Sequence, residues 1–340
     1  MSIVTRPRLL FAGWLAGSLF FLAAAWAEEM PVDSAKAMPE APATSDADWM
    51  KILRRSSDSL QWSDDIIRHD WRLQRRPGAD RFRILDPRDE VVEEGSRQAC
   101  LESLTTLEQA GRVPAVTGRT VIVLHGLGEG RRSMRPLVEY LRNNIDATVL
   151  SFGYASTSAG IDDHGRSLAA VIEHLPAADS ISFVGHSMGN LVVRRWMGLA
   201  DEDDLARIRR MVMLGPPNQG SELARMVAKI SVLAALSNGA ARELVLDWNR
   251  ISPNLAVPRC PFGIVAGGKG DERGYSSFLA GDDDAVVRVE ETRLHGSDDF
   301  LLLPVHHAAM MKSPTVQQAT VAFLNTGRFP APALPAAAAK

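Results

Sequence analysis

The sequence is poor in cysteine and carries little excess charge. Each of these two features excludes a class of function. Only two cysteines occur among 340 residues, Cys100 and Cys260. Neither has a metal-ligand spacing, so we expect no zinc site. In an exported protein the two can pair, and we expect a Cys100–Cys260 disulfide, with two free thiols as the alternative. The formal net charge is −3 and no Lys/Arg-rich tract occurs, so no nucleic-acid partner is expected.

The first 27 residues have the pattern of a secretion signal. Arg6 and Arg8 form a basic region, an uncharged apolar stretch covers 9–26, and Ala-Trp-Ala at 25–27 offers a cleavage site. We therefore expect a signal peptide at 1–27 and a periplasmic or extracellular protein. The alternative is an uncleaved membrane anchor, because the apolar stretch is just long enough to span a bilayer.

The rest of the chain reads as one domain, 47–329, between two low-complexity ends. Residues 28–46 and 330–340 are rich in Ala and Pro, and we expect a flexible leader and a disordered tail. Within the domain, β-prone runs alternate with helical patterns, which predicts an α/β fold with a mostly parallel, doubly wound sheet and helices on both faces. The expected strands are 121–124, 148–152, 181–184, 211–214, 262–266 and 300–303, and the expected helices are 96–109, 134–141, 166–175 and 315–324.

Two segments stand outside this alternation. The β-prone runs 66–74 and 81–84 predict an N-terminal hairpin that enters the sheet. Residues 221–258 form an insertion with apolar residues at helical spacing. This insertion is either a crossover helix packed on the sheet or a cap that presents apolar surface to an acyl chain.

The most informative motif is Gly-His-Ser-Met-Gly at 185–189, which follows an apolar run and precedes a helical pattern. Strand, sharp turn and helix are the context of a nucleophile elbow, in which the serine hydroxyl stands clear of the backbone. The tight turn demands small residues beside it, and Gly185 and Gly189 meet that demand. We predict Ser187 as a nucleophile; the alternative is a glycine-rich turn with an idle serine.

A serine nucleophile needs a base, and the base needs an orienting carboxylate. In this context the acid and then the histidine follow the serine along the chain. The acids Asp282–Asp284 come after the fifth expected strand, and His306 and His307 come directly after the sixth. Both segments lie past the carboxyl ends of strands, where open α/β sheets bind ligands.

Acyl transfer also needs N–H donors for the negatively charged oxygen of the tetrahedral intermediate. The first expected strand ends in His-Gly-Leu-Gly-Glu-Gly at 125–130. The turn at Gly126 can direct the N–H of Leu127 into the site, and the residue after the nucleophile, Met188, supplies the second donor.

Together these segments resemble the α/β-hydrolase serine esterases, in the lipase-like branch that includes bacterial triacylglycerol lipases and GPI-inositol-deacylase-like proteins. The similar segments are VIVLHGLG (121–128), FVGHSMGN (183–190), MLGPPNQGS (213–221), DDAVV (283–287) and the histidine before AAMM (308–311). The resemblance implies the α/β-hydrolase fold, with Ser187 as nucleophile, Asp284 as acid and His307 as base. Where the family writes D-G-x-V this chain has DAVV, and its alanine keeps Asp283 open; His306 stays an alternative to His307.

The resemblance implies an esterase or lipase that cleaves carboxylic esters through an acyl-enzyme, and the pattern at 1–27 predicts that it is exported. The implied partner is a small-molecule or lipid ester, with transient contact to a lipid surface. We expect no cofactor and no metal, because the three adjacent acids alone do not form an oxygen cage for calcium. An acyltransferase would use the same residues, whereas a non-catalytic binding protein on this scaffold would have a broken triad.

Overall fold

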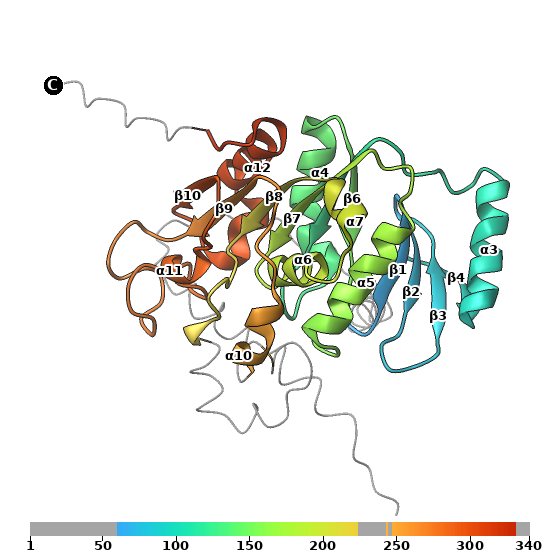
Figure 1. Ribbon diagram of the computed structural model, residues 1–340, viewed down its shortest axis with the longest axis horizontal. Helices are drawn as coiled ribbons and strands as arrows, with labels where there is room; N and C mark the ends of the chain where they lie inside the picture. Colours follow the sequence, from blue (N-terminus) through green and yellow to red (C-terminus); the bar gives the residue numbers. More distant parts are fainter. Residues whose placement is uncertain (1–59, 224–242, 244–246, 331–340) are drawn as a thin grey trace, which may run out of the picture.

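The computed structural model describes residues 60–223, 243 and 247–330, and Figure 1 shows a central sheet with helices on both faces and a smaller sheet at one end. The domain boundaries at 47 and 329 stay predictions. Several expected features lie wholly or largely outside the described residues: the signal segment 1–27, the leader 28–46, the insertion 221–258 and the tail 330–340.

The central sheet has six parallel strands in the order β10-β9-β8-β7-β5-β6. All six expected strands are present. After β6 the chain returns to the other side of β5, so the order reverses there, and the carboxyl ends of β5 and β7 flank the point where such sheets bind ligands. The strands are β5 (Arg119–Leu124), β6 (Thr148–Phe152), β7 (Ser180–His186), β8 (Ile208–Leu214), β9 (Phe262–Gly267) and β10 (Asp299–Leu303).

Alternate residues of β5 pack on opposite faces of the sheet. Val121 and Val123 join a buried cluster with α4 and α12, whereas Ile122 and Leu124 join a cluster with α5 and α6. A strand covered on both faces must be apolar at every position, which explains the uninterrupted apolar run. The helices are α4 (Arg135–Asn144), α5 (Ile161–Glu173), α6 (Gly189–Met197) and α12 (Pro314–Thr326), with the shorter η2 (Arg131–Met134), α7 (Glu202–Ala206), α10 (Trp248–Ile251), η4 (Ser252–Asn254), α11 (Val289–Thr292) and η5 (His307–Lys312).

The expected N-terminal hairpin is present, but it belongs to a separate antiparallel sheet of order β1-β2-β3-β4 instead of entering the central one. The run 66–74 is not one strand, because the chain turns at His69, whose φ is 53°. Short connections let consecutive strands pair with one another, and α3 (Arg97–Gln109) covers the apolar face of the small sheet. Its strands are β1 (Ser63–Arg68), β2 (Trp71–Arg75), β3 (Phe82–Leu85) and β4 (Val91–Gly95).

The prediction of a Cys100–Cys260 disulfide is wrong, since both thiols are free. Cys100 is buried between α3 and the small sheet, whereas Cys260 packs against the core of the central sheet just before β9. Figure 1 places α3 and β9 toward opposite ends of the molecule. The two thiols therefore belong to separate cores, and burial raises the pKa of Cys260 to about 12, which leaves it unreactive.

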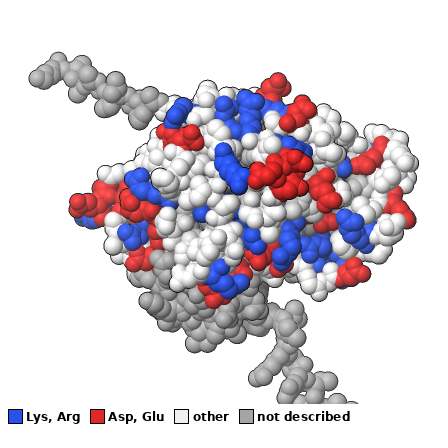
Figure 2. All heavy atoms as spheres, in the orientation of Figure 1, with Lys and Arg blue, Asp and Glu red and all other residues white. Residues whose placement is uncertain are grey.

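Surface charge is mixed in sign. On the face drawn in Figure 2, basic and acidic side chains are interspersed over the described residues. Within those residues no helix combines the length and apolarity needed to cross a bilayer. The same part of the chain holds no group of three or more His, Cys, Asp or Glu side chains arranged for a metal ion.

Candidate active site

Ser187 lies on a strained turn between β7 and α6. Its φ is 51°, a left-handed value that costs a non-glycine residue about 1–3 kcal/mol. Its backbone N–H donates to Leu214 O on the next strand at 2.8 Å. A Cβ at Gly185 would lie 2.3 Å from Asn190 Oδ1, and one at Gly189 would lie 2.7 Å from His125 O. Only glycine fits either position, so the local geometry is that of a nucleophile elbow.

Asp284 and His307 form a buried acid–base pair. His307 Nδ1 lies 2.7 Å from Asp284 Oδ2, and Asp284 is 0% exposed. The other carboxylate oxygen accepts the backbone N–H groups of Val286 and Val287 at 3.0 and 2.7 Å. The backbone N–H of His307 also donates to Asp284 O at 2.8 Å. These bonds fix the carboxylate, which in turn fixes the orientation of the imidazole.

Two opposing effects set the proton affinity of His307. Burial alone would lower its pKa, but the charge of Asp284 and the hydrogen bond to it outweigh burial, so the pKa is raised. With Nδ1–H donated to the carboxylate, Nε2 is the nitrogen that can accept a proton. The pair therefore has the arrangement of a general base with its orienting acid.

The structure separates Asp283 from this pair. Asp283 Oδ1 accepts the N–H groups of Ser276 and Ala285 at 2.9 and 2.7 Å and so holds its own loop together. Ala285 has a φ of 82°, a conformation that glycine adopts without strain. The alanine therefore occupies the position where the family writes glycine, which supports the register that makes Asp284 the acid.

His306 lies outside the pair as well. Its side chain is exposed and packs against Tyr275, with the ring centroids 3.8 Å apart and the rings tilted by 40°. Lys269 Nζ lies over the Tyr275 ring, 4.9 Å from its centre. His306 thus belongs to a surface aromatic contact, while its neighbour His307 is 7% exposed and faces Asp284.

Gly215, to which the sequence analysis gave no role, brings the pair up to the elbow. It follows β8 with a φ of 52°, and a Cβ there would lie 3.0 Å from His307 Nδ1. The rings of His186 and His307 are 4.6 Å apart, so His307 packs against the residue that precedes Ser187. In the described chain the side-chain bond of His307 goes to Asp284, and none joins it to the Ser187 hydroxyl; such bonds often tighten only when substrate binds.

The loop 125–130 lies against the nucleophile. A Cβ at Gly126 would lie 3.1 Å from Ser187 Cβ, so a side chain there would press on the nucleophile. Leu127 follows this glycine and is partly buried, and Met188 is fully buried on the other side of Ser187. Their backbone N–H groups stay predicted as the oxyanion donors.

His125 braces the start of this loop. Nδ1 donates to Gly126 O at 2.9 Å, and Nε2 accepts the backbone N–H of Tyr154 at 3.3 Å. The rings of His125 and Tyr154 stack with their centroids 4.1 Å apart. Burial lowers the pKa of His125, which agrees with a neutral ring that donates from one nitrogen and accepts at the other. It is a core histidine whose two ring nitrogens are both hydrogen-bonded.

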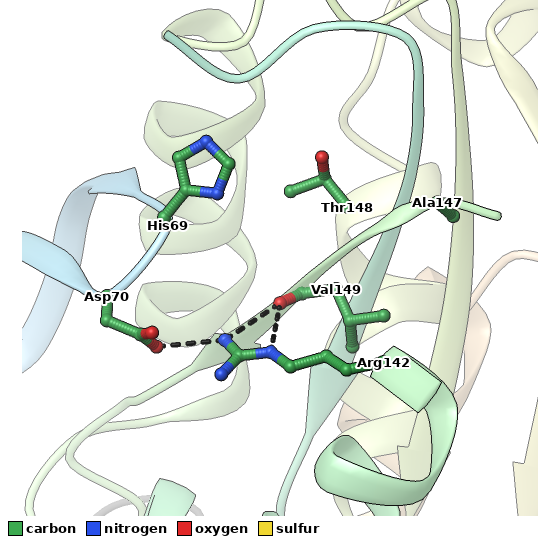
Figure 3. A pocket seen from close by; sticks show the side chains of 6 residues that line it. All are labelled: His69, Asp70, Arg142, Ala147, Thr148 and Val149. Carbon is green, nitrogen blue, oxygen red and sulfur yellow. Dashed lines mark hydrogen bonds and ion pairs between the residues drawn. The ribbon is translucent and has the colours of Figure 1, made fainter. Parts of the chain in front are cut away.

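The hollow drawn in Figure 3 is not part of this site. Its volume is about 390 Å³, and its lining includes Thr148 and Val149 at the amino end of β6, the edge of the sheet opposite Ser187. The Arg142 guanidinium crosses it to Asp70 Oδ1 at 2.9 Å and to Val149 O at 3.1 Å. Its most polar lining group is therefore already bonded within the protein.

The family comparison agrees with this geometry. The family model for the alpha/beta hydrolase fold matches residues 119–244, which include the loop 125–130 and the elbow. The protein has the α/β-hydrolase fold, so the resemblance noted from its motifs is confirmed at the level of the fold. No curated protein matches the chain.

Solved structures of similar fold include several lipases and esterases. The mature form of lipase BlEst2 from Bacillus licheniformis is 18% identical, with 63% of this chain and 94% of that chain covered and a TM-score of 0.47. Phospholipase PlaB from Legionella pneumophila with thio-NAD is 18% identical over 62% and 59%, with a TM-score of 0.44. The metagenomic carboxyl esterase MGS0156 is 19% identical over 58% and 68%, with a TM-score of 0.40. Identities and TM-scores this low do not assign an activity.

Proposed function

We propose that the protein is a serine hydrolase that cleaves carboxylic esters through an acyl-enzyme. The observation that carries the proposal is Ser187, held at a φ of 51° on the elbow, next to the buried Asp284–His307 pair. Backbone strain at a partly buried residue such as Ser187 persists only where the surrounding structure requires it, and such strain clusters at active sites.

The first half of the reaction forms the acyl-enzyme. Ser187 Oγ attacks the ester carbonyl while His307 Nε2 takes the hydroxyl proton, and Asp284 stabilises the resulting imidazolium. The N–H groups of Leu127 and Met188 bind the oxyanion. The tetrahedral intermediate then collapses, the C–O bond to the alcohol breaks, and His307 returns its proton to the leaving alkoxide. In the second half, His307 activates water by the same route and the acid is released.

A panel of p-nitrophenyl esters from acetate to palmitate tests this function. We expect turnover of at least one ester, its loss in Ser187→Ala, and stoichiometric labelling of Ser187 by a fluorophosphonate. Adding an alcohol acceptor separates hydrolysis from acyl transfer, because a transferase would convert the acyl group to the new ester in preference to the free acid. A wild-type protein that neither turns over esters nor reacts with the probe would overturn the proposal.

The substrate and location are part of the proposal. The resemblance favours a small-molecule or lipid ester, with transient contact to a lipid surface, and the pattern at 1–27 favours export to the periplasm or beyond. Turnover on ester-containing vesicles against soluble esters tests the first point. The mass of the protein recovered from a periplasmic extract tests the second, since cleavage after Ala27 gives a defined N-terminus.

A further inference from the structure

A second carboxylate, Glu129, organises the loop 125–130. Its Oε2 accepts the backbone N–H of Gly126 at 3.1 Å and the Ser133 hydroxyl at 2.8 Å. The backbone carbonyl of Glu129 also accepts the Ser156 hydroxyl at 3.1 Å. The Glu129 side chain therefore bonds back to Gly126, the glycine at which a Cβ would lie 3.1 Å from Ser187 Cβ. The predicted oxyanion donor, the N–H of Leu127, belongs to the next residue.

His186 connects this carboxylate to the catalytic pair. Its Nδ1 lies 3.4 Å from Glu129 Oε2, and its Nε2 lies 3.2 Å from the backbone oxygen of His307. His186 is 0% exposed. A continuous set of contacts thus runs from Gly126 through Glu129 and His186 to the backbone of His307, directly behind the nucleophile.

The charge of Glu129 is retained in this setting. Burial would raise its pKa, but the charge of His186 and the hydrogen bonds from His186 and Gly126 outweigh burial, so the pKa is lowered. An ionised carboxylate only accepts hydrogen bonds, which suits the three donors that surround it. Hydrogen bonds to an ionised group are stronger than neutral ones, so the bonds from Gly126 and Ser133, at 3.1 and 2.8 Å, hold the loop firmly.

We propose that Glu129 and His186 are positioning residues that fix the oxyanion loop relative to His307. The inference rests on the proposed function and adds a second histidine–carboxylate pair with a different task. Asp284 orients the ring that moves the proton, whereas Glu129 and His186 hold the backbone that stabilises the charge. Among the described residues, neither side chain is hydrogen-bonded to the Ser187 hydroxyl or to the His307 ring.

Steady-state kinetics of Glu129→Ala, Glu129→Gln and His186→Asn, per site titrated with a fluorophosphonate, test the proposal. We expect Glu129→Ala to lower kcat about 10- to 100-fold with little change in KM, because a displaced donor loop weakens transition-state binding. Glu129→Gln keeps an acceptor oxygen and should recover part of the loss. The double variant Glu129→Ala/His186→Asn should lose no more than the worse single variant, since residues of one unit are not additive. Glu139→Ala is the control, because Glu139 is 64% exposed on α4.

The outcomes separate positioning from mere stability. A lower kcat per titrated site, with melting temperature kept in Glu129→Gln and a parallel slowing of fluorophosphonate labelling, supports the proposal. A lower melting temperature or fewer titratable sites with normal kcat per site overturns it, as does a full effect in Glu139→Ala or additivity in the double variant. If the wild-type protein neither hydrolyses esters nor reacts with the probe, the proposed function fails and this inference falls with it.

Discussion

Two regions of the molecule each bury a carboxylic side chain beside a basic one, and the two pairs have different roles. At the carboxyl edge of the central sheet, Asp284 pairs with His307. Between the small sheet and the central sheet, Asp64 on β1 pairs with Arg72 on β2 at 2.5 Å, and the two side chains are 0% and 1% exposed. The first pair orients a ring that packs against the residue before Ser187, whereas Asp64 joins two strands of the small sheet to each other and to the end of β6.

The contacts of Asp64 show that difference. Besides Arg72, its carboxylate accepts the Gln74 amide at 2.8 Å and the backbone N–H of Gly153, just past β6, at 2.7 Å. Arg72 in turn donates to Ser151 O on β6 at 2.6 Å. The bonds from Gly153 to Asp64 and from Arg72 to Ser151 fix how the two layers dock, although Arg72 Nε and Nη2 are buried without a hydrogen-bond partner among the described residues. We therefore expect changes at the catalytic edge to remove activity and spare stability, and changes at this interface to do the reverse.

The largest expected effect is that of Ser187→Ala. Losing the nucleophile should lower kcat at least about 10⁴-fold, because the remaining site offers only binding and oxyanion stabilisation. The melting temperature should change little, since the hydroxyl donates to no group that holds the turn together. Activity within tenfold of wild type would remove Ser187 as nucleophile and break the comparison at its strongest point.

His307→Ala should cost nearly as much as Ser187→Ala, since both act as one unit. His306→Ala is the matched control one residue away. The His306 ring packs against Tyr275 at the surface, so we expect kcat within about threefold of wild type, because exposed substitutions away from the reacting atoms change little. The reverse order in ester hydrolysis would show that the register after β10 is off by one.

The third expected effect contrasts two adjacent acids. Asp284→Asn should lower kcat about 10⁴-fold with the fold intact, since the amide no longer selects the productive tautomer of His307. Asp283→Asn should chiefly loosen the loop that Asp283 Oδ1 holds, which thermal unfolding would record. A larger loss of kcat in Asp283→Asn would reassign the acid.

The catalytic edge could be predicted from the sequence, whereas the interface could not. A nucleophile on a tight turn needs glycines at fixed positions, so chemistry leaves a motif at Gly185 and Gly189. Six β-prone runs predicted all six central strands; burial on both faces leaves an apolar pattern in the inner strands, such as β5, whereas β10 at the edge of the sheet is only partly buried. Asp64 and Arg72 have no such pattern: polar residues alternating along a strand normally face water, and only the docked sheets show that they face each other.

Long-range pairing also escaped the sequence for Glu129 and His186. Glu129 lies in a glycine-rich turn and His186 at the end of a strand, 57 positions apart. Neither position carries a local signal for a partner. The turn at His69 was not predicted either, because the residues on both sides of it are β-prone and form one uninterrupted run in the sequence.

Asp64→Asn tests the interface. Removing one charge leaves Arg72 buried and unpaired, which typically costs about 3–5 kcal/mol in the free energy of unfolding. Urea unfolding measures this loss. Asp70→Asn is the control, because Asp70 pairs with Arg142 at 2.9 Å where both are about 40% exposed, and such surface pairs contribute about 0–1 kcal/mol. A fall in kcat per folded molecule, with stability unchanged, would place the interface among the determinants of activity.

The smallest expected effect is a displaced pH profile, and it sharpens the comparison because it opposes activity to stability at one residue. Catalysis needs neutral His307, whose pKa is raised above its ordinary value of 6.5. The acid limb of kcat/KM should therefore have an apparent pKa above 6.5, and Asp284→Asn should move that limb to lower pH.

The contribution of His307 to stability changes with pH in the opposite direction to activity. A raised folded-state pKa stabilises the fold below the unfolded pKa, and that contribution is lost as pH rises through the folded value. Activity should thus increase over the pH range in which this contribution to the free energy of unfolding disappears, and His307→Ala should abolish the second trend. An apparent pKa below 6.5 for the acid limb of kcat/KM would show that burial, and not Asp284, dominates the titration of His307.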